Sequence, residues 1–273
     1  MPEKTAYLLF DGIALRTYKR NGRRIKRLRD NYRTVYPESS GGEIEELVKA
    51  GVRNAMRYWC DTFRISDWDR QRIADTVTTE NNDLFLRSVK SAQGVIVALP
   101  HAGNWDHAGL YYCSQGITVY TVAEHLRPER LFRKFLAHRE RMGIKVLDLE
   151  AKVTDELVKR LEEGKLVALV ADRDLSKSGV DVDFFNSNAR MPAGPALLAY
   201  RTKAHLITAF VSYTKPGIHI RFSGPFLVNQ AKSEKEEVQR ITQAIADQFA
   251  EDIRRDPTSW HMQQRIFIDR RSD

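Results

Sequence analysis

The sequence is poor in cysteine and contains no long hydrophobic run. Its 273 residues include only two cysteines, Cys60 and Cys113, which are too few for a disulfide-rich scaffold or a cysteine-based zinc site and are typical of a reducing compartment. No apolar stretch reaches the ~18 residues that indicate a membrane-spanning helix. The first residues also lack the apolar core of a secretory signal peptide. We therefore expect a protein that is cytoplasmic or lies on the surface of a membrane.

Internal repeats, low-complexity segments and metal-ligand motifs are missing as well. The seven histidines show no spacing such as His-x3-His, so we expect no metal site. The composition, 42% hydrophobic and 29% charged, is that of an ordinary globular protein, and the length suits one large or two small domains. We expect a single domain over residues 1–273, with a basic helical region at 1–42 and an α/β core at 43–273.

Positive charge is concentrated near the amino terminus. The net charge is +8, and Asp30 is the only acid in the strongly basic segment 16–33. Apolar residues are interleaved with these charges, namely Leu9, Phe10, Ile13, Leu15, Tyr18, Ile25 and Leu28. The pattern is typical of an amphipathic helix on an anionic membrane surface, although a helix with a merely solvated basic face fits it equally well. No helix-turn-helix or RNA-binding motif accompanies the charges, so we expect no nucleic acid partner.

Apolar β-branched runs alternate with helical patterns in the middle of the chain. The predicted buried strands are residues 95–99, 116–123, 144–147 and 166–171, with helices at 128–142 and 154–163. This alternation predicts an α/β fold with a mostly parallel, twisted central sheet, right-handed crossovers and flanking helices. A hairpin is predicted at 205–213 and 217–222, and further helices at 43–63, 67–77 and 234–255.

The segment 94–106 joins the first predicted strand to a helix and contains His101 and Asp106. Residues five positions apart on a regular helix differ by about 140° in direction, so these two side chains meet only if the chain bends between them, which Gly103 allows. A carboxylate on one imidazole nitrogen fixes the tautomer and leaves the other nitrogen able to accept a proton. The alternative is a histidine that serves only as a turn residue.

Two other predicted strands end in charged residues. Residues 116–123 lead into Glu124, and residues 166–171 lead into Asp172, Arg173 and Asp174. Because the carboxyl ends of parallel strands meet at one edge of a sheet, we expect these groups to lie near His101. Taken alone, the sequence Asp172-Arg173-Asp174 also fits a surface turn with a local ion pair.

The string Leu-Pro-His-Ala-Gly-Asn-Trp-Asp at residues 99–106 resembles the His-x4-Asp motif of the bacterial lauroyl/myristoyl acyltransferases of lipid A synthesis. The chain is more similar still to the actinobacterial phosphatidylinositol mannoside acyltransferases, over residues 51–267. Further similar segments are 121–124 with Arg139, 171–175, 179–185, 190–195 and the sequence Trp260-His261-Met262.

The resemblance implies a glycerol-3-phosphate-acyltransferase-like fold and transfer of a long acyl chain, such as palmitoyl, from acyl-CoA to a mannose hydroxyl of a glycolipid. It implies that His101 is the base and that the acid at position 172 pairs with it, although the family often has glutamate where this chain has Asp172. The substrate contacts that it implies are Gly103, Asn104, Trp105, Glu124, Arg139, Arg173, Asp174 and Arg190. Its co-substrate would be acyl-CoA, and no cofactor is implied. Because the acceptor is an insoluble lipid, we expect a peripheral protein at the cytoplasmic face of the plasma membrane, and we expect it to be a monomer.

A hydroxyl group is a poor nucleophile at neutral pH, so acyl transfer to it needs a base. His101 is the candidate, and either Asp106 or Asp172 would offset the positive charge that it acquires. No Gly-x-Ser-x-Gly sequence is present, so we expect no covalent acyl-enzyme.

The oxyanion of the tetrahedral intermediate needs hydrogen-bond donors. Either Arg139 or backbone N–H groups near Gly103 and Asn104 could supply them, and the sequence does not choose between these two. The basic segment 128–142 is a candidate partner for the phosphates of CoA. Two other functions also fit the sequence. One is an acyltransferase with a lysophospholipid or lipid A-type acceptor, and the other is a non-catalytic protein that binds anionic lipid.

Overall fold

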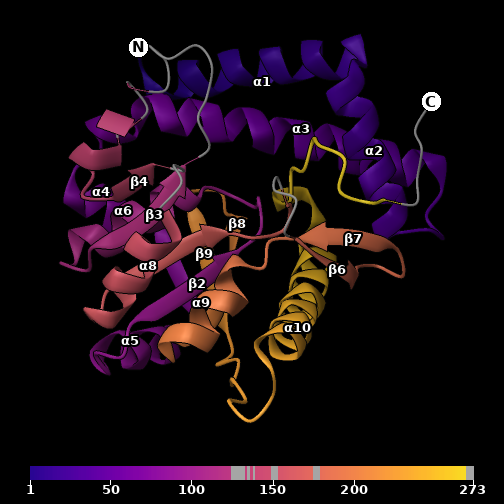
Figure 1. Cartoon of the computed structure of the whole chain (residues 1–273). Coiled ribbons are helices and arrows are strands. Elements are labelled where there is room, and N and C mark those ends of the chain that lie inside the picture. Colours follow the sequence, from indigo (N-terminus) through magenta and orange to yellow (C-terminus); the bar gives the residue numbers. More distant parts are fainter. Residues whose placement is uncertain (124–132, 134–135, 138, 149–152, 175–178, 269–273) are drawn as a thin grey trace.

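A seven-stranded sheet organises the molecule (Figure 1). The computed structural model describes residues 1–123, 133, 136–137, 139–148, 153–174 and 179–268. The strands are β1 (Val77–Glu80), β2 (Val95–Leu99), β3 (Val119–Ala123), β4 (Lys145–Asp148), β5 (Leu166–Val170), β8 (His205–Tyr213) and β9 (Ile218–Ser223). Their order is β1-β9-β8-β2-β5-β3-β4, and among the described pairs of this sheet only β8–β9 is antiparallel. The predicted α/β class, the mostly parallel sheet and the hairpin are therefore confirmed.

Helices cover both faces of the sheet, which is why its central strands are almost entirely apolar. On one face lie α5 (Asn82–Lys90) and α6 (Trp105–Ser114), and on the other lie α8 (Val153–Glu162), α9 (Gly194–Thr202) and α10 (Glu234–Arg255). Alternate residues of β2 point to opposite faces, so Val97 packs in the core beneath α5 and α6, whereas Ile96 packs in the core beneath α9 and α10.

Three parts of the chain differ from the prediction or extend it. The segment 67–77 is not one helix. A 3-10 turn η1 (Ile65–Asp67) and the short helix α4 (Arg70–Asp75) are followed by β1, whose β-branched residues pair with β9. The strands β6 (Val180–Asp183) and β7 (Asn188–Met191) form a separate antiparallel hairpin that the sequence did not predict. Of the predicted helix 128–142, residues 133, 136–137 and 139–141 are helical, and 128–132, 134–135 and 138 lie outside the described residues.

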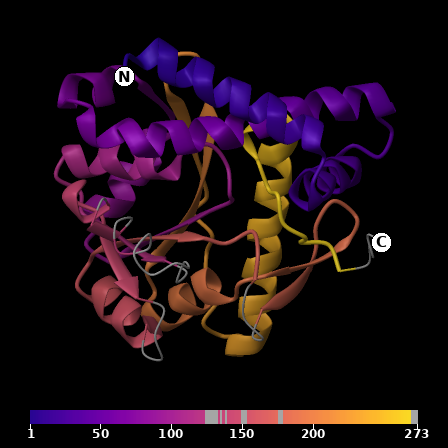
Figure 2. The same ribbon diagram turned by 90° about the horizontal axis from the view of Figure 1, so that it is seen from above.

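The expected helical amino-terminal region is confirmed, but its two helices have different surroundings. Figures 1 and 2 show α1 (Glu3–Arg20) lying along α3 (Gly41–Arg64), with α2 (Arg23–Val35) at one end of the pair. The apolar side of α2 is buried, with Ile25 and Leu28 in the main core, so these two residues are not available to a membrane. On α1, by contrast, Leu8, Leu9 and Leu15 are more than half exposed. Among the described residues, no helix has both the length and the apolar character needed to cross a bilayer.

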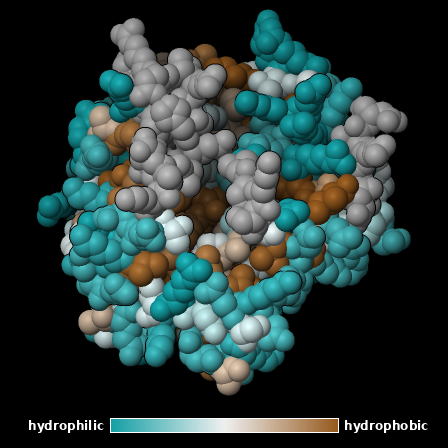
Figure 3. Space-filling view, viewed as in Figure 1, coloured by the Kyte–Doolittle hydropathy of each residue, from teal (hydrophilic) through white to brown (hydrophobic). Residues whose placement is uncertain are grey.

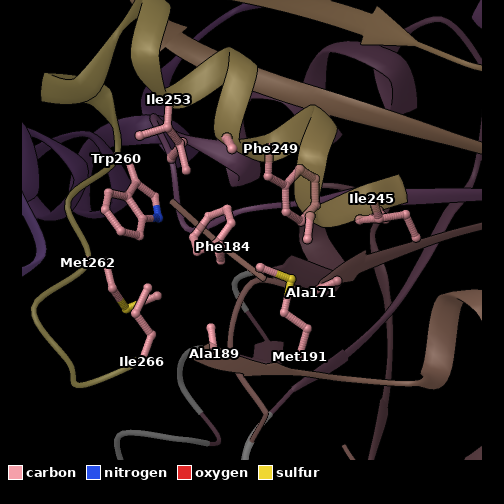
Figure 4. Close-up of a cluster of buried hydrophobic side chains, with 14 of the residues drawn as sticks. Ala171, Phe184, Ala189, Met191, Ile245, Phe249, Ile253, Trp260, Met262 and Ile266 are labelled. Atoms are coloured by element: carbon pink, nitrogen blue, oxygen red, sulfur yellow. The ribbon is translucent and has the colours of Figure 1, made fainter. Parts of the chain in front are cut away.

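The carboxyl-terminal segment returns from α10 across the end of the sheet. It begins with the 3-10 turn η2 (Pro257–Ser259) and continues in extended form, with a β-bridge between Trp260 and Ala102. Figure 4 shows the Trp260 indole beside Phe184, Ile253 and Met262, in the cluster that α10 makes with the β6–β7 hairpin. The segment thereby reaches the edge of the sheet where β2 and β5 end.

Candidate active site

His101 and Asp172 follow two neighbouring strands and lie directly opposite each other. In the parallel pair of β2 and β5, Leu99 faces Val170, and each of the two polar residues comes two positions later. The His101 Nδ1 atom lies 2.5 Å from Asp172 Oδ1, and the His101 backbone N–H donates to Asp172 Oδ2 at 2.9 Å. The strand register therefore brings together the histidine and one of its two candidate carboxylates.

Asp172 is fully buried and is held by three donors. Besides the two groups of His101, the Trp260 Nε1–H donates to Asp172 Oδ2 at 2.9 Å. Burial alone would raise the pKa of this carboxyl. The charge of His101 and the hydrogen bonds from His101 and Trp260 outweigh it and hold the pKa of Asp172 below its ordinary value. Asp172 is therefore an anion beside the imidazole at neutral pH.

The other side of the His101 ring is accessible. The side chain is 30% exposed, and the Trp105 ring lies against it in a T-shaped arrangement with the ring centroids 5.7 Å apart. Because the Nδ1–H is committed to Asp172, Nε2 carries the lone pair that can accept a proton. The arrangement is that of a general base whose tautomer is fixed by a buried carboxylate.

Asp106 makes other contacts. It lies in the first turn of α6, and its carboxylate turns toward α3 and toward Arg139, which donates from Nε at 2.8 Å, while the Tyr58 hydroxyl donates at 2.8 Å. All three residues are buried. The pairing of His101 with Asp106 that the five-residue spacing suggested is therefore replaced by the pair with Asp172, because the helix turns the Asp106 side chain away from the imidazole.

Gly103 provides the bend that the sequence predicted. Its φ is +59°, and a Cβ atom there would lie 2.3 Å from the Val211 carbonyl oxygen. Its N–H donates to the Ser259 carbonyl at 2.8 Å, and Asn104 caps α6 by accepting from the His107 N–H at 3.0 Å. The expected oxyanion donors Gly103 and Arg139 are thus engaged within the protein.

The remaining predicted contact residues are spread over the same end of the sheet. Arg173 follows Asp172 directly, and the Asp174 N–H donates to the Arg190 carbonyl at 3.0 Å. The Arg190 guanidinium lies 3.9 Å from Asp174 and 3.7 Å from Asp181, at the base of the β6–β7 hairpin. Glu124 lies outside the described residues.

An apolar cavity lies between the sheet and α6. It is lined by residues of β2, β3, β5, β8 and β9, by α6 and by Phe85 of α5. Trp105, Asp106 and Arg139 line it as well, whereas Phe85, Tyr112 and Phe222 form a packed aromatic group in its wall. Hydrophobic side chains also occupy a hollow near the centre of the face in Figure 3. On β5 the lining runs from Leu166 to Val170, four steps of about 3.3 Å, which gives a length of about 13 Å.

Sequence reasoning missed three aromatic neighbours of the site. Trp260 bonds to Asp172, Tyr58 bonds to Asp106, and the His261 Nε2–H donates to the Gly103 carbonyl at 3.2 Å. Burial lowers the pKa of His261 to about 4, so this ring is neutral at neutral pH. The Trp260-His261-Met262 sequence was noticeable, but nothing in it indicated a bond to position 172.

Comparison with known proteins finds relatives over nearly the whole chain. The family model described as bacterial lipid A biosynthesis acyltransferase matches residues 1–268. A Mycolicibacterium smegmatis protein named phosphatidylinositol mannoside acyltransferase is 36% identical over 276 residues, which cover 100% of this chain and 88% of the relative. A protein of the same name from Mycobacterium tuberculosis H37Rv is 35% identical over 273 residues, which cover 97% of this chain and 83% of the relative.

Replacing Asp106 with asparagine should lower the free energy of unfolding by about 3–5 kcal/mol, because the buried Arg139 guanidinium then loses its ion pair with this carboxylate. Denaturant titration followed by circular dichroism measures the change. The control Asp83→Asn removes a carboxylate from an exposed pair with Arg87 and should cost less than about 1 kcal/mol. Equal, small losses in the two variants would contradict a structural role for Asp106.

Proposed function

Since the chain belongs to the bacterial lipid A biosynthesis acyltransferase family, and is thus an acyltransferase, we propose that it moves a long acyl group from acyl-CoA to a mannose hydroxyl of phosphatidylinositol mannosides. The names of the mycobacterial relatives support this acceptor. We propose the glycerol-3-phosphate-acyltransferase-like fold for it as well, since the parallel sheet carries its histidine at the carboxyl end of a central strand.

The observation that carries the proposal is a histidine–carboxylate pair beside a long apolar cavity. The pair supplies the base that an alcohol acceptor needs, and the cavity supplies a site for a hydrocarbon chain. Trp105 belongs to both, because its ring touches His101 and lines the cavity. A thioester carbonyl near Trp105 would therefore lie between the acyl chain and the base.

In the proposed step, His101 Nε2 takes the proton of the acceptor hydroxyl as its oxygen attacks the thioester carbonyl carbon. The C–O bond forms, the C–S bond then breaks, and the thiolate leaves and takes up a proton from the imidazolium. Asp172 stabilises that imidazolium and keeps the ring in one tautomer. The chain's own base suffices for this step, so acyl-CoA enters as co-substrate and no cofactor is required. The thiolate of CoA leaves without the help of a strong acid, because its thiol has a pKa of roughly 8.5.

The acyl chain would occupy the cavity along β5, between the sheet and α6. Leu166, Ala168 and Val170 face it from that strand. About 13 Å of apolar wall suits an extended hydrocarbon rather than a compact ligand. This wall would hold part of a long acyl chain such as palmitoyl, whose remaining carbons would extend beyond it.

We further propose that α1 contacts the cytoplasmic face of the plasma membrane, where the acceptor lipid resides. Its apolar residues Leu8 and Leu15 are 71% and 53% exposed, and they lie close to the basic segment 16–33 along the chain. Exposed apolar residues together with positive charge are typical of a peripheral helix on anionic lipid.

The variant His101→Ala should lower acyl transfer by at least about a hundred-fold, because a general base contributes roughly 10²–10⁴ to the rate. The assay follows labelled palmitate from palmitoyl-CoA to purified phosphatidylinositol mannoside. His205→Ala is the control, since this histidine bonds to Gln93 at the opposite end of the sheet. Product lipid from the parent and from His205→Ala, with at least about a hundred-fold less from His101→Ala, would support the proposal. Free fatty acid alone would contradict the acceptor, and lysophospholipids would be tried next.

The variant Ala168→Leu should shift the preferred donor toward shorter chains. The larger side chain fills the middle of the cavity, so the ratio of kcat/KM for palmitoyl-CoA to that for octanoyl-CoA should fall by about ten-fold or more. Measuring both donors on one preparation separates chain selection from a general loss of active protein. An unchanged ratio would mean that the acyl chain lies elsewhere.

The double variant Leu8→Glu/Leu15→Glu should bind vesicles of anionic phospholipid more weakly than the parent, because charged side chains resist burial in the membrane interface. Co-sedimentation measures the bound fraction, and added salt should weaken binding of the parent by screening its basic segment. Leu227→Glu is the control, since Leu227 is 77% exposed but follows β9, far from α1 in the chain. Equal binding of all three proteins would refute the role of α1.

A further inference from the structure

The carboxyl-terminal segment 257–264 lies between α2 and the turn that carries His101. On the α2 side, the Tyr32 hydroxyl lies 3.0 Å from the carbonyl oxygens of both Pro257 and Trp260. The Asn31 amide donates to the carbonyls of Met262 at 2.9 Å and Gln264 at 3.0 Å. One turn of α2 thus holds the backbone of the segment over most of its length.

On its other side, the same segment is bonded to the catalytic turn. The Gly103 N–H donates to the Ser259 carbonyl, and Ala102 forms a β-bridge with Trp260. The Trp260 indole N–H completes the connection by its bond to Asp172 Oδ2. A chain of contacts therefore runs from α2, through Trp260, to the carboxylate that orients His101.

We propose that Trp260 is a positioning residue for the pair of His101 and Asp172, and that Tyr32 of α2 keeps Trp260 in place. The amino-terminal helix α2 is then part of the active-site scaffold. This inference rests on the proposed function for its assay, but the contacts that carry it are independent of the acceptor and the donor.

Two donors on one oxygen explain why Trp260 matters. Asp172 Oδ2 receives the His101 backbone N–H and the Trp260 indole N–H, which together fix the plane of the carboxylate and point Oδ1 at the imidazole. With the indole N–H removed, a fully buried anion loses one donor and one restraint on its rotation. The imidazole would then sample orientations in which Nε2 no longer faces the acceptor.

The surroundings of Tyr32 are adapted to its hydroxyl group. The residue is fully buried, and Gly51 of α3 lies so close that a Cβ atom there would come within 2.3 Å of the hydroxyl oxygen. Glycine in a helix interior is unfavourable by itself. At position 51 it leaves the space that the Tyr32 hydroxyl group occupies between α3 and the segment 257–264.

The variants Trp260→Phe and Tyr32→Phe test the proposal. Trp260→Phe should lower kcat by about ten- to a hundred-fold with little change in the KM for acyl-CoA, because the base is misoriented while the cavity is intact. Tyr32→Phe should lower kcat by less, since its effect passes through Trp260. Tyr36→Phe is the matched control, because Tyr36 directly follows α2 and its hydroxyl also donates to a carbonyl, that of Arg254, outside the segment.

The pH profile separates positioning from general loosening of the structure. The Trp260 hydrogen bond is one of the groups that lower the pKa of Asp172, so its removal raises that pKa. Activity on the acid side is lost when the imidazole is protonated, and a more basic Asp172 holds that proton more strongly. The fall in activity on the acid side should therefore move to higher pH in Trp260→Phe. A purely structural defect would scale the whole profile down and leave its position unchanged, and that result would overturn the proposal.

Proton NMR gives a measure that needs no activity. The proton between His101 and Asp172 should give a downfield signal that is absent in His101→Gln, shifted in Trp260→Phe and unchanged in Tyr36→Phe. If Trp260→Phe does not fold, benzothienylalanine at position 260 keeps the indole shape and lacks the N–H. An unshifted signal in Trp260→Phe, or in the benzothienylalanine variant at position 260, would overturn the positioning role of Trp260. A shifted signal in a protein that transfers no acyl group would uphold it and refute the proposed function instead.

Discussion

A carboxylate without solvent contact remains charged only if donors replace the water that it has lost. Asp172 is such a group, and most features of the site supply its donors or hold them in place. The register of β2 with β5 brings His101 opposite to it, and the extended segment after η2 delivers the Trp260 indole. Because the donors come from two distant residues, His101 and Trp260, the charged state of Asp172 depends on the correct packing of this sheet edge.

Asp106, the second buried carboxylate of the site, has a different role from Asp172 because its place in the fold gives it different partners. Asp106 lies five residues after His101, yet it is compensated by Arg139 and Tyr58 and has no bond to the imidazole. Its ion pair joins α6 to the segment that carries Arg139 and so fixes one wall of the apolar cavity. The His-x4-Asp motif thus contains both the proposed proton acceptor and a structural ion pair, and the carboxylate that pairs with His101 follows the neighbouring strand of the sheet.

Several elements were predictable because their signals are local. Strands β2 and β8 and helix α10 begin and end at the predicted residues, since apolar runs and helical spacing mark them clearly. Strand β1 was missed because its four residues, Val77–Glu80, owe their conformation to pairing with β9, far along the chain. The choice between Asp106 and Asp172 also stayed open, because a five-residue spacing does not reveal which way a side chain turns after a bend. The bond from Trp260 to Asp172 spans 88 positions and left no pattern in the sequence.

The amino-terminal helices connect the proposed membrane-contact surface of α1 with the site that contains His101 and Asp172. In α1, leucine side chains point outward, as expected of a helix that lies on lipid, whereas α2 turns its apolar and aromatic residues inward. Tyr32 and Asn31 of α2 hold the segment that bears Trp260, and α1 packs along α3, which in turn contacts α2. The proposed membrane contact and the catalytic pair therefore rest on one packed group of helices. A protein docked through α1 would present His101 at a fixed height and orientation relative to the membrane surface, which favours an acceptor whose hydroxyl is itself held at a constant distance from the bilayer.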